Sequence, residues 1–249
     1  MPMGNSALAV LETALRERKL DRTLTTALPP LDRNDPGAFV PFDHSGLDAL
    51  LSGGLPRGHL SEIAGPSSSG RTTVLQRVMG AITRRGEIAA LIDTCDRLDV
   101  ASASAAGIDL DRLLRVRGEA APIDRAVDHA VKALNLVLQS GGFALVAIDL
   151  ADVPLPVLKR LPFTTWLRVQ RIVEGSDTAC VLVVPEPLAR SAGGLTVRCT
   201  GQTKWSGRLT GLDTTIRVVS SRRRVEAETV LQALSSDEVT RHFVDSSLR

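Results

Sequence analysis

Nine residues between an apolar stretch and a helical stretch have the spacing of a loop that binds phosphate. They are Gly65, Pro66, Ser67, Ser68, Ser69, Gly70, Arg71, Thr72 and Thr73. The pattern G-x-x-x-x-G-K-[ST] is met at every fixed position except one, where Arg71 replaces lysine. Glycines at both ends let successive backbone N–H groups face inward, and the following helix would point its positive end at a phosphate. Thr72 would be the magnesium ligand, whereas an ordinary Ser/Gly turn is the alternative.

A magnesium ion at such a loop needs a carboxylate from a second strand, and two aspartates qualify. Asp149 ends the apolar run 143–149, and Asp93 ends the run 88–93 in the same manner. An ionised carboxylate at the end of a buried strand is costly unless it is paired or functional. Carboxyl ends of parallel strands share the sheet edge at which ligands bind. We expect Asp149 to be the metal ligand, with Asp93 as its competitor.

Strands and helices alternate between residues 61 and 184, which predicts an α/β fold with a mainly parallel central sheet. The predicted strands are 61–65, 88–93, 113–118, 143–149 and 179–184, and the predicted helices are 72–86, 123–139 and 157–174. After Pro187, shorter alternating runs predict antiparallel strands at 195–199, 203–209 and 214–221, followed by a short helix at 226–234.

The first residues of the chain predict an amphipathic helix. Leu8, Leu11 and Leu15 recur at helical spacing among the charged residues of 6–20. The stretch 24–40 contains prolines and a glycine that interrupt regular structure, which predicts a linker. Such a helix packs either on a neighbouring molecule or on its own core, and both alternatives stay open. The expected organisation is an N-terminal helix and linker at 1–40, a core at 41–224 and a tail at 225–249.

Two segments resemble the bacterial RecA recombinases. Residues 46–74 are similar to the family segment in which a GGLP-x-G turn and a strand lead into a GPESSGKTT loop. Residues 91–114 are similar to the family's FIDAEHALDPxYAxxLGVDxDxLL. The resemblance covers about residues 6–220 and implies a RecA-like core with ATP and magnesium as ligands. It also implies that Asp149 is the Walker B residue and that Leu8, Leu11 and Leu15 contact a partner.

The chain departs from this family at residues that the resemblance would assign to hydrolysis. Arg71 stands at the family's lysine, Cys95 at the glutamate that activates water, and Glu186 at the glutamine that senses the outer phosphate. A guanidinium can still pair with phosphate oxygens, but it is larger and planar, and a thiol is a poor substitute for a carboxylate. Asp96 is a possible substitute for the glutamate, although in an extended segment it would point to the opposite side.

The segments that correspond to the family's two DNA-contacting loops look shortened, at 150–157 and 187–194, so strand exchange is not expected. Arg222, Arg223 and Arg224 could bind DNA, although such a run is more often a solvated strand edge. Trp205 is expected to pack on the predicted hairpin.

Three functions are compatible with these residues. The favoured one is an adaptor similar to the ImuA-type proteins of bacterial damage-induced mutagenesis, which would contact RecA or translesion polymerase components. It would bind ATP with weak or no hydrolysis and could self-associate. The second is an active DNA-dependent ATPase in which Arg71 and Asp96 replace the usual lysine and glutamate. The third is a structural module that has lost the nucleotide.

Composition argues against three further classes: general nucleic-acid binders, membrane or secreted proteins, and proteins held together by disulfides or structural zinc. The formal net charge of +2 over 249 residues gives no general attraction to nucleic acid, so any DNA contact would be local and weak. No apolar run approaches the ~20 residues of a membrane span, and the first residues lack a secretory pattern, which predicts a cytoplasmic protein without a membrane partner. Three widely spaced cysteines favour neither a disulfide framework nor structural zinc.

Overall fold

The computed structural model describes residues 37–51, 53–119, 121–189, 193–206, 209–220 and 228–234. The predicted helix 6–20 and the run Arg222, Arg223 and Arg224 lie outside the described residues.

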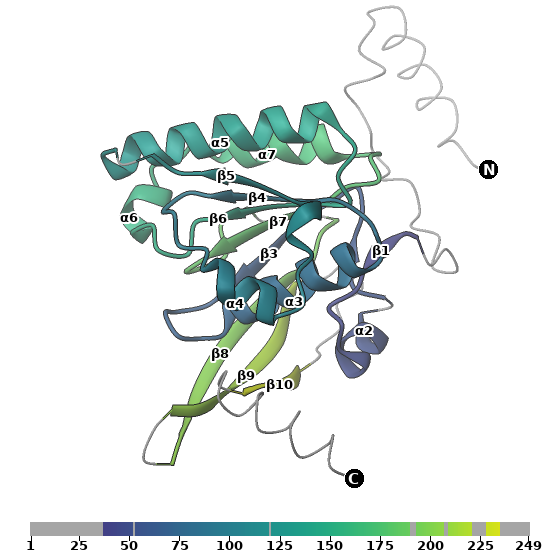
Figure 1. Ribbon diagram of the computed structural model, residues 1–249. Coiled ribbons are helices and arrows are strands. Elements are labelled where there is room, and N and C mark those ends of the chain that lie inside the picture. The colour runs from purple at the N-terminus through teal and green to yellow at the C-terminus, as the bar shows by residue number, and fades with distance from the viewer. Residues whose placement is uncertain are drawn as a thin grey trace, which may run out of the picture. The chain divides into compact units, whose positions relative to one another are not determined.

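An eight-stranded sheet forms the centre of the described chain, in the order β10-β9-β8-β3-β7-β6-β4-β5 (Figure 1). Parallel pairing joins β3 (Leu60–Ala64), β4 (Ala89–Asp93), β5 (Leu113–Arg117), β6 (Leu145–Asp149), β7 (Ala179–Val184) and β8 (Thr196–Trp205). Antiparallel pairing adds β9 (Leu209–Ser220) and β10 (Glu228–Leu234) at one edge. The prediction of a mainly parallel sheet with antiparallel C-terminal strands is confirmed.

Helices cover both faces of the parallel part of the sheet (Figure 1). On one face lie α5 (Ile123–Ser140) and α7 (Phe163–Val173), and on the other lie α3 (Arg71–Arg84) and α4 (Val100–Ala105). The shorter elements are α2 (Ser45–Leu50), α6 (Leu155–Leu158) and the strand pair β1 (Phe39–Val40) and β2 (Leu55–Pro56). Among the described residues, no helix combines the length and apolar character that crossing a membrane requires.

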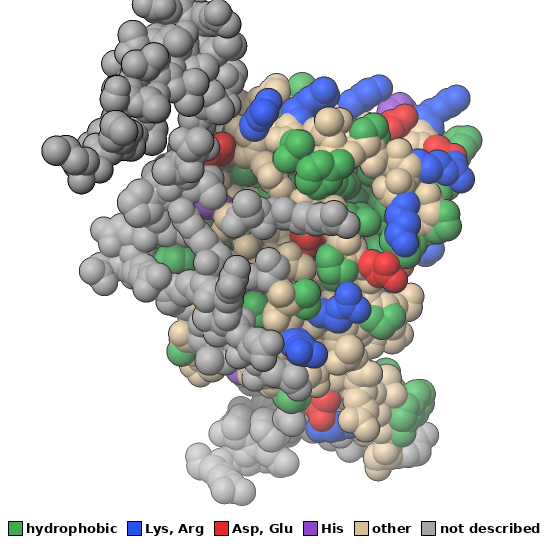
Figure 2. All heavy atoms as spheres, turned by 180° about the vertical axis from the view of Figure 1, so that it is seen from behind, with side chains coloured by type: hydrophobic (Ala, Val, Ile, Leu, Met, Phe, Trp, Pro, Cys, Tyr) green, Lys and Arg blue, Asp and Glu red, His purple; other side chains and the backbone are tan. Residues whose placement is uncertain are grey.

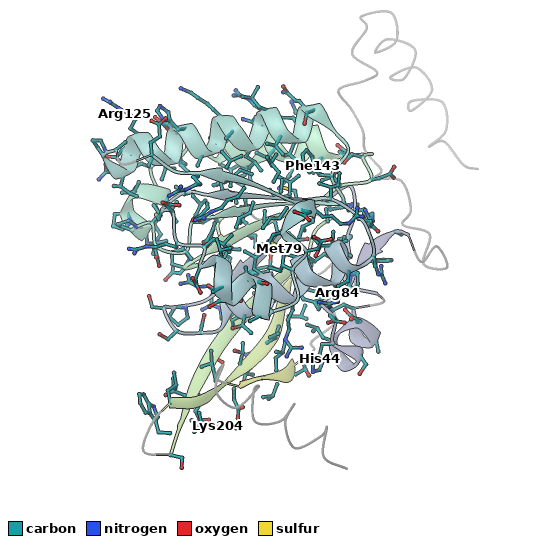
Figure 3. The ribbon with its side chains drawn as sticks, viewed as in Figure 1. His44, Met79, Arg84, Arg125, Phe143 and Lys204 are labelled. Atoms are coloured by element: carbon teal, nitrogen blue, oxygen red, sulfur yellow. The ribbon has the colours of Figure 1, made fainter. Side chains whose placement is uncertain are left out.

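Strand β7 shows how the sheet supplies two cores, because successive side chains of a strand point to opposite faces. Val181 and Val183 pack in the cluster under α3, together with Met79, which Figure 3 labels. Cys180 and Leu182 pack in the cluster under α5 and α7. All six residues of β7 are buried, as a strand with helices on both faces requires.

The prediction of a helix over 226–234 is wrong, because residues 228–234 form strand β10. The strand pairs antiparallel with β9, with Val230 opposite Thr215 and Leu231 opposite Thr214. Leu231 is buried and Val230 is exposed, which is the alternation expected of a strand. In a segment of only nine residues, the hydrophobic pattern alone does not distinguish this period of two from the period of a helix.

Two further predicted elements differ from the structure. The single helix predicted over 157–174 is divided into α6 and α7, and α7 begins after Pro162, whose ring disfavours a continuous helix. The predicted separate strand 203–209 is wrong, because β8 extends to Trp205 and β9 begins at Leu209, which pairs with Trp205. Trp205 is 69% exposed, so the expectation that it packs on the hairpin is also wrong. The last residues of the predicted linker 24–40 form β1.

Candidate nucleotide-binding site

The loop of residues 65–70 joins the carboxyl end of β3 to the first turn of α3. Its backbone passes through two left-handed residues, Ser68 with a φ of 58° and Gly70 with a φ of 88°. Gly70 is the N-cap of α3, and no side chain of the described residues caps the helix there. The first N–H groups of α3 have no intrahelical acceptor, so the positive end of the helix is available to an anion.

Residues of strands β8 and β9 pack closely against the glycines of this loop. A side chain at Gly70 would overlap Thr214 of β9, with Thr214 Cγ2 only 2.7 Å from the added Cβ. A Cβ at Gly65 would lie 2.5 Å from the carbonyl oxygen of Cys199 on β8. Both glycines are therefore required by close packing. No local pattern predicts the role of Thr214, because its contact with the loop depends on the pairing of β9 with β8.

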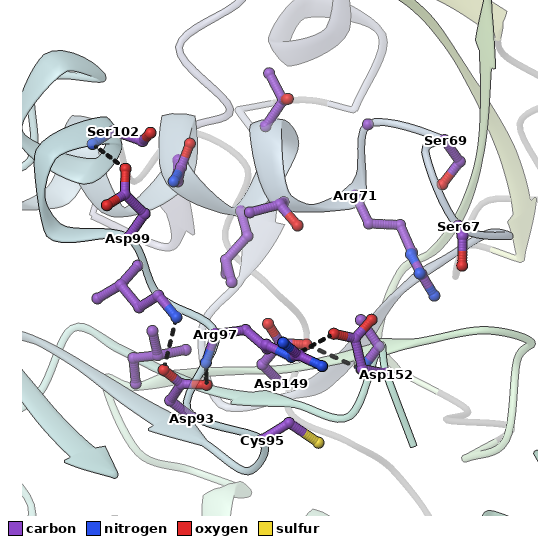
Figure 4. Close-up of a pocket in the computed structure, with 18 of the residues that line it drawn as sticks. Ser67, Ser69, Arg71, Asp93, Cys95, Arg97, Asp99, Ser102, Asp149 and Asp152 are labelled. Carbon is purple, nitrogen blue, oxygen red and sulfur yellow. Dashed lines mark hydrogen bonds and ion pairs between the residues drawn. The ribbon is translucent and has the colours of Figure 1, made fainter. Parts of the chain in front are cut away.

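A cavity of about 540 Å³ opens between this loop and the carboxyl ends of β4 and β6 (Figure 4). Its volume is within the range of small-molecule sites. The predicted residues Ser67–Thr73 form one wall, and segments that follow β4 and β6 form the other. The charged and thiol side chains among the lining residues are Arg71, Asp93, Cys95, Arg97, Asp99, Asp149 and Asp152.

Arg71 is a buried cation in this cavity. Its exposed fraction is 6%, and its Nη1 atom has no hydrogen-bond partner among the described residues. Burial lowers the pKa of the guanidinium, and the charges of Asp149 and Asp152 oppose that effect. A buried cation with an unused donor is costly in a folded protein, which suits it to an anionic ligand.

Asp149 and Thr72 line the same cavity and fit a magnesium ion that arrives with a phosphate ligand. One carboxylate oxygen of Asp149 accepts the N–H of Ala151 at 2.9 Å, which leaves the other oxygen for a ligand. Magnesium usually takes one or two protein oxygens together with water and substrate phosphates. Within the described residues, no group of three or more His, Cys, Asp and Glu could hold a metal without such a ligand.

Asp149→Asn is expected to stabilise the protein at pH 7. Burial raises the pKa of Asp149, and the nearby carboxylates of Asp93 and Asp152 add to this, against the opposing Ala151 N–H and Arg71. The folded state therefore binds more protons than the unfolded state, and the free energy of unfolding falls as pH rises through the window between the ordinary and raised pKa.

Thermal unfolding across a pH series measures this effect. The variant should melt roughly 2–4 °C above the wild-type protein at pH 7. The difference should narrow as the pH is lowered towards 3.8, the ordinary carboxyl pKa, because the wild-type side chain then becomes neutral as well. A variant that melts below the wild-type protein at pH 7 would contradict the expectation.

The carboxylate of Asp93, the alternative metal ligand, is already bonded to donors within the protein. Its carboxylate is almost fully buried and accepts the N–H groups of Arg97 and Leu98, each at 2.8 Å. The guanidinium of Arg115 donates to the same carboxylate from Nε at 3.1 Å and from Nη2 at 2.6 Å. These bonds hold the turn after β4 in place, and they favour Asp149 over Asp93 as the residue that faces a ligand.

The structure brings Cys95 to the cavity and turns Asp96 away from it. Burial raises the pKa of the Cys95 thiol, and the charge of Asp152 raises it further. Asp96 has a left-handed backbone with a φ of 53°, and its carboxylate binds Arg117 at 2.6 Å and Arg115 at 2.7 Å. Asp96 is not among the lining residues, so the idea that it replaces a water-activating glutamate is corrected by this geometry.

Glu186 also lies away from the cavity. It follows β7, its side chain is 55% exposed, and its carboxylate is 3.9 Å from Nζ of Lys159. Sequence reasoning missed a second glutamate, Glu62, which is fully buried in β3. Glu62 accepts the N–H groups of Leu188 at 2.7 Å and Ala189 at 2.8 Å, so it fixes the segment after β7. A charged residue within the buried run 61–64 was the available signal.

The sequence of this chain is similar to one protein family and to several known proteins. Residues 40–157 match the family described as the RecA N-terminal domain. Protein RecA of Clavibacter michiganensis is 34% identical over 144 residues, which are 52% of this chain and 38% of that protein. Protein RecA of Nostoc punctiforme is 37% identical over 103 residues, which are 41% of this chain and 27% of that protein. The chain thus spans well under half the length of these relatives.

The fold is that of an α/β protein whose first long parallel strand leads through a glycine loop into a helix. Residues 40–157 are similar to the RecA N-terminal domain family, and the mainly parallel core that contains them is RecA-like.

Proposed function

We propose that this protein is a RecA-like adaptor in bacterial DNA repair or damage-induced translesion mutagenesis, as the ImuA-type proteins are. It binds ATP with magnesium, hydrolyses it weakly or not at all, and lacks strand exchange. One observation carries this proposal: the cavity combines an intact phosphate loop, Thr72 and Asp149 with Arg71 and Cys95 at the positions of the family's lysine and glutamate.

The residues of the cavity favour binding over cleavage. The N–H groups at the start of α3 and the buried guanidinium of Arg71 would hold phosphate oxygens. Thr72 and Asp149 would hold magnesium, which supplies neutralisation of phosphate charge when it is bound. Cys95 has a raised pKa and is a neutral thiol at pH 7, so it offers no carboxylate to orient a water molecule.

Protection of Cys95 from a thiol reagent tests binding directly. Cys95 is partly exposed in the cavity, whereas Cys180 and Cys199 are buried with pKa values raised to about 12. We expect the reagent to label Cys95 alone in the native protein. Magnesium-ATP at ten times its Kd should slow that labelling about tenfold.

The Cys95→Ser variant is the control, because it should lose native labelling while it retains the fold. Hydrolysis is then measured on the same wild-type preparation with single-stranded DNA. Turnover far below that of a recombinase supports the adaptor. Robust DNA-stimulated turnover would favour an active ATPase, and labelling that ATP does not slow would favour a module without nucleotide.

The partners in this proposal are RecA, translesion polymerase components or a second copy, met in the cytoplasm. DNA contact is secondary, because on the face that Figure 2 shows the basic side chains of the described residues are interrupted by other side chains. Figure 2 shows Lys and Arg side chains along the edge where α5 and α7 lie, with apolar and acidic side chains between them. The exposed basic residues of these helices are Arg125, Lys132, Arg168 and Arg171. Contact through Leu8, Leu11 and Leu15, or through Arg222, Arg223 and Arg224, remains part of the proposal.

A further inference from the structure

Arg97 is a second arginine at the cavity, on the wall opposite the phosphate loop. It follows β4, and Figure 4 shows its side chain beside Asp149 with its guanidinium directed towards Asp152. Where the resembling RecA segment reads FIDAEHALD, this chain reads LIDTCDRLD, so the arginine stands at an alanine position. Arg71 and Arg97 therefore bring two guanidinium groups to one cavity from two different elements.

The backbone of Arg97 is fixed, whereas its side chain is free to turn. Its N–H donates to the buried carboxylate of Asp93 at 2.8 Å, which is itself held by Arg115. The side chain of Arg97 is 70% exposed. Because the backbone of Arg97 is held in place and its side chain is exposed, the guanidinium can turn to reach different partners without movement of the fold.

The partner of Arg97 in this structure is a weak one. Its Nε atom lies 3.1 Å from an oxygen of Asp152, whose side chain is 47% exposed. The closest approach to Asp152 is made by Nε and not by an Nη atom. Exposed ion pairs contribute little to stability, because water solvates both charges after separation. Exchange of Asp152 for a stronger anion therefore costs little.

The charges that line the cavity indicate which anion could replace Asp152 as the partner of Arg97. Of the four lining aspartates, Asp93 is bound by Arg115 and Asp99 caps α4 through the N–H of Ser102 at 2.8 Å. Asp149 and Asp152 then balance Arg71 and Arg97. A terminal phosphate carries more negative charge than a carboxylate and offers several oxygens for charge-assisted bidentate bonds, whereas the closest contact of Arg97 with Asp152 is made through Nε.

We propose that Arg97 is a phosphate-binding residue that exchanges Asp152 for the outermost phosphate of a nucleoside triphosphate. This inference rests on the proposed function. The loop and Arg71 anchor the inner phosphates, and Arg97 closes on the outer one from the opposite wall. Because Cys95 supplies no carboxylate of its own to activate water, Arg97 makes the site a sensor of the triphosphate state.

Equilibrium binding of a non-hydrolysable ATP analogue and of ADP to the full chain tests the role of Arg97. The wild-type protein should prefer the triphosphate. Arg97→Ala should weaken binding of the analogue by roughly tenfold and leave ADP binding nearly unchanged, since ADP lacks the outer phosphate. Asp152→Asn should strengthen binding of the analogue about threefold, because it frees Arg97 and removes a repelling charge.

The matched control is Arg168→Ala, which removes an exposed arginine of α7 and should bind both nucleotides as the wild-type protein does. Arg97→Lys should give an intermediate loss, because it keeps the charge and loses the bidentate geometry. Equal effects of Arg97→Ala on the analogue and ADP, or no effect on either, would overturn the role of Arg97 alone. A wild-type protein without saturable binding of either nucleotide would overturn the proposed function and this inference together.

Discussion

Asp93→Ala is expected to lower the free energy of unfolding by about 2–4 kcal/mol. The carboxylate is 1% exposed and receives four donor contacts, from two backbone N–H groups and two nitrogens of Arg115. Alanine would leave the N–H groups of Arg97 and Leu98 without acceptors. It would also leave Arg115, whose side chain is 19% exposed, with Asp96 as its only carboxylate partner among the described residues.

Urea unfolding at pH 7 measures the loss, and Asp124→Ala provides the matched control. Asp124 pairs with Arg160 at 3.3 Å on the surface, with both side chains more than 60% exposed, so its removal should cost about 0–1 kcal/mol. Asp93→Asn should fall between the two, because the amide retains one acceptor oxygen. If Asp93→Ala and Asp124→Ala unfold at the same urea concentration, the turn after β4 does not depend on Asp93.

The parallel part of the fold could be predicted because its residues obey local rules. Each strand is a short, mainly apolar run that ends near a polar residue or glycine. Each helix has apolar residues that recur at the helical spacing of about 3.6 residues. The prediction for β7 at 179–184 matches the structure, and β3 is displaced by one residue. The positions of the loop after β3 and of Asp149 at the end of β6 were predicted from this order, since carboxyl ends of parallel strands lie at one edge.

The antiparallel part could not be predicted in the same way, because long-range pairing determines it. The interval between the predicted strands 203–209 and 214–221 implied a turn at 210–213, yet β9 runs from Leu209 to Ser220 and Leu209 pairs with Trp205 of β8. Residues 228–234 become a strand because β9 offers free backbone groups, not because of their own composition. The contact of Thr214 with Gly70 depends on that same register.

The direction of side chains in the turn after β4 also lay beyond local reasoning. Alternation assumed an extended segment, whereas Cys95 and Asp96 lie in a turn and Asp96 has a φ of 53°, so the rule could identify neither their directions nor their partners. Asp96 is drawn away by Arg115 and Arg117 of β5, a neighbour that the order of strands in the sheet supplies. Arg97 was missed as a cavity residue because its role depends on Asp152, which lies beyond a different strand.

Gly70→Ala is expected to weaken nucleotide binding by at least about tenfold, because the loop must move to accommodate it. A Cβ at this position would overlap the side chain of Thr214 on β9, and Thr214 is itself fully buried. The φ of 88° adds strain for any residue with a side chain. Displacement of the loop would shift the first N–H groups of α3 and the neighbouring Arg71 away from a common phosphate position.

Gly86→Ala separates backbone strain from this packing effect. Gly86 follows α3 with a φ of 83°, and an added Cβ would have no atom within 4 Å. It should lose about 1 kcal/mol of stability and retain nucleotide binding. Both variants are compared at a temperature where circular dichroism shows each to be folded, and binding is measured by protection of Cys95. Equal protection of Cys95 in Gly70→Ala and Gly86→Ala would mean that the close contact with Thr214 does not shape the phosphate site.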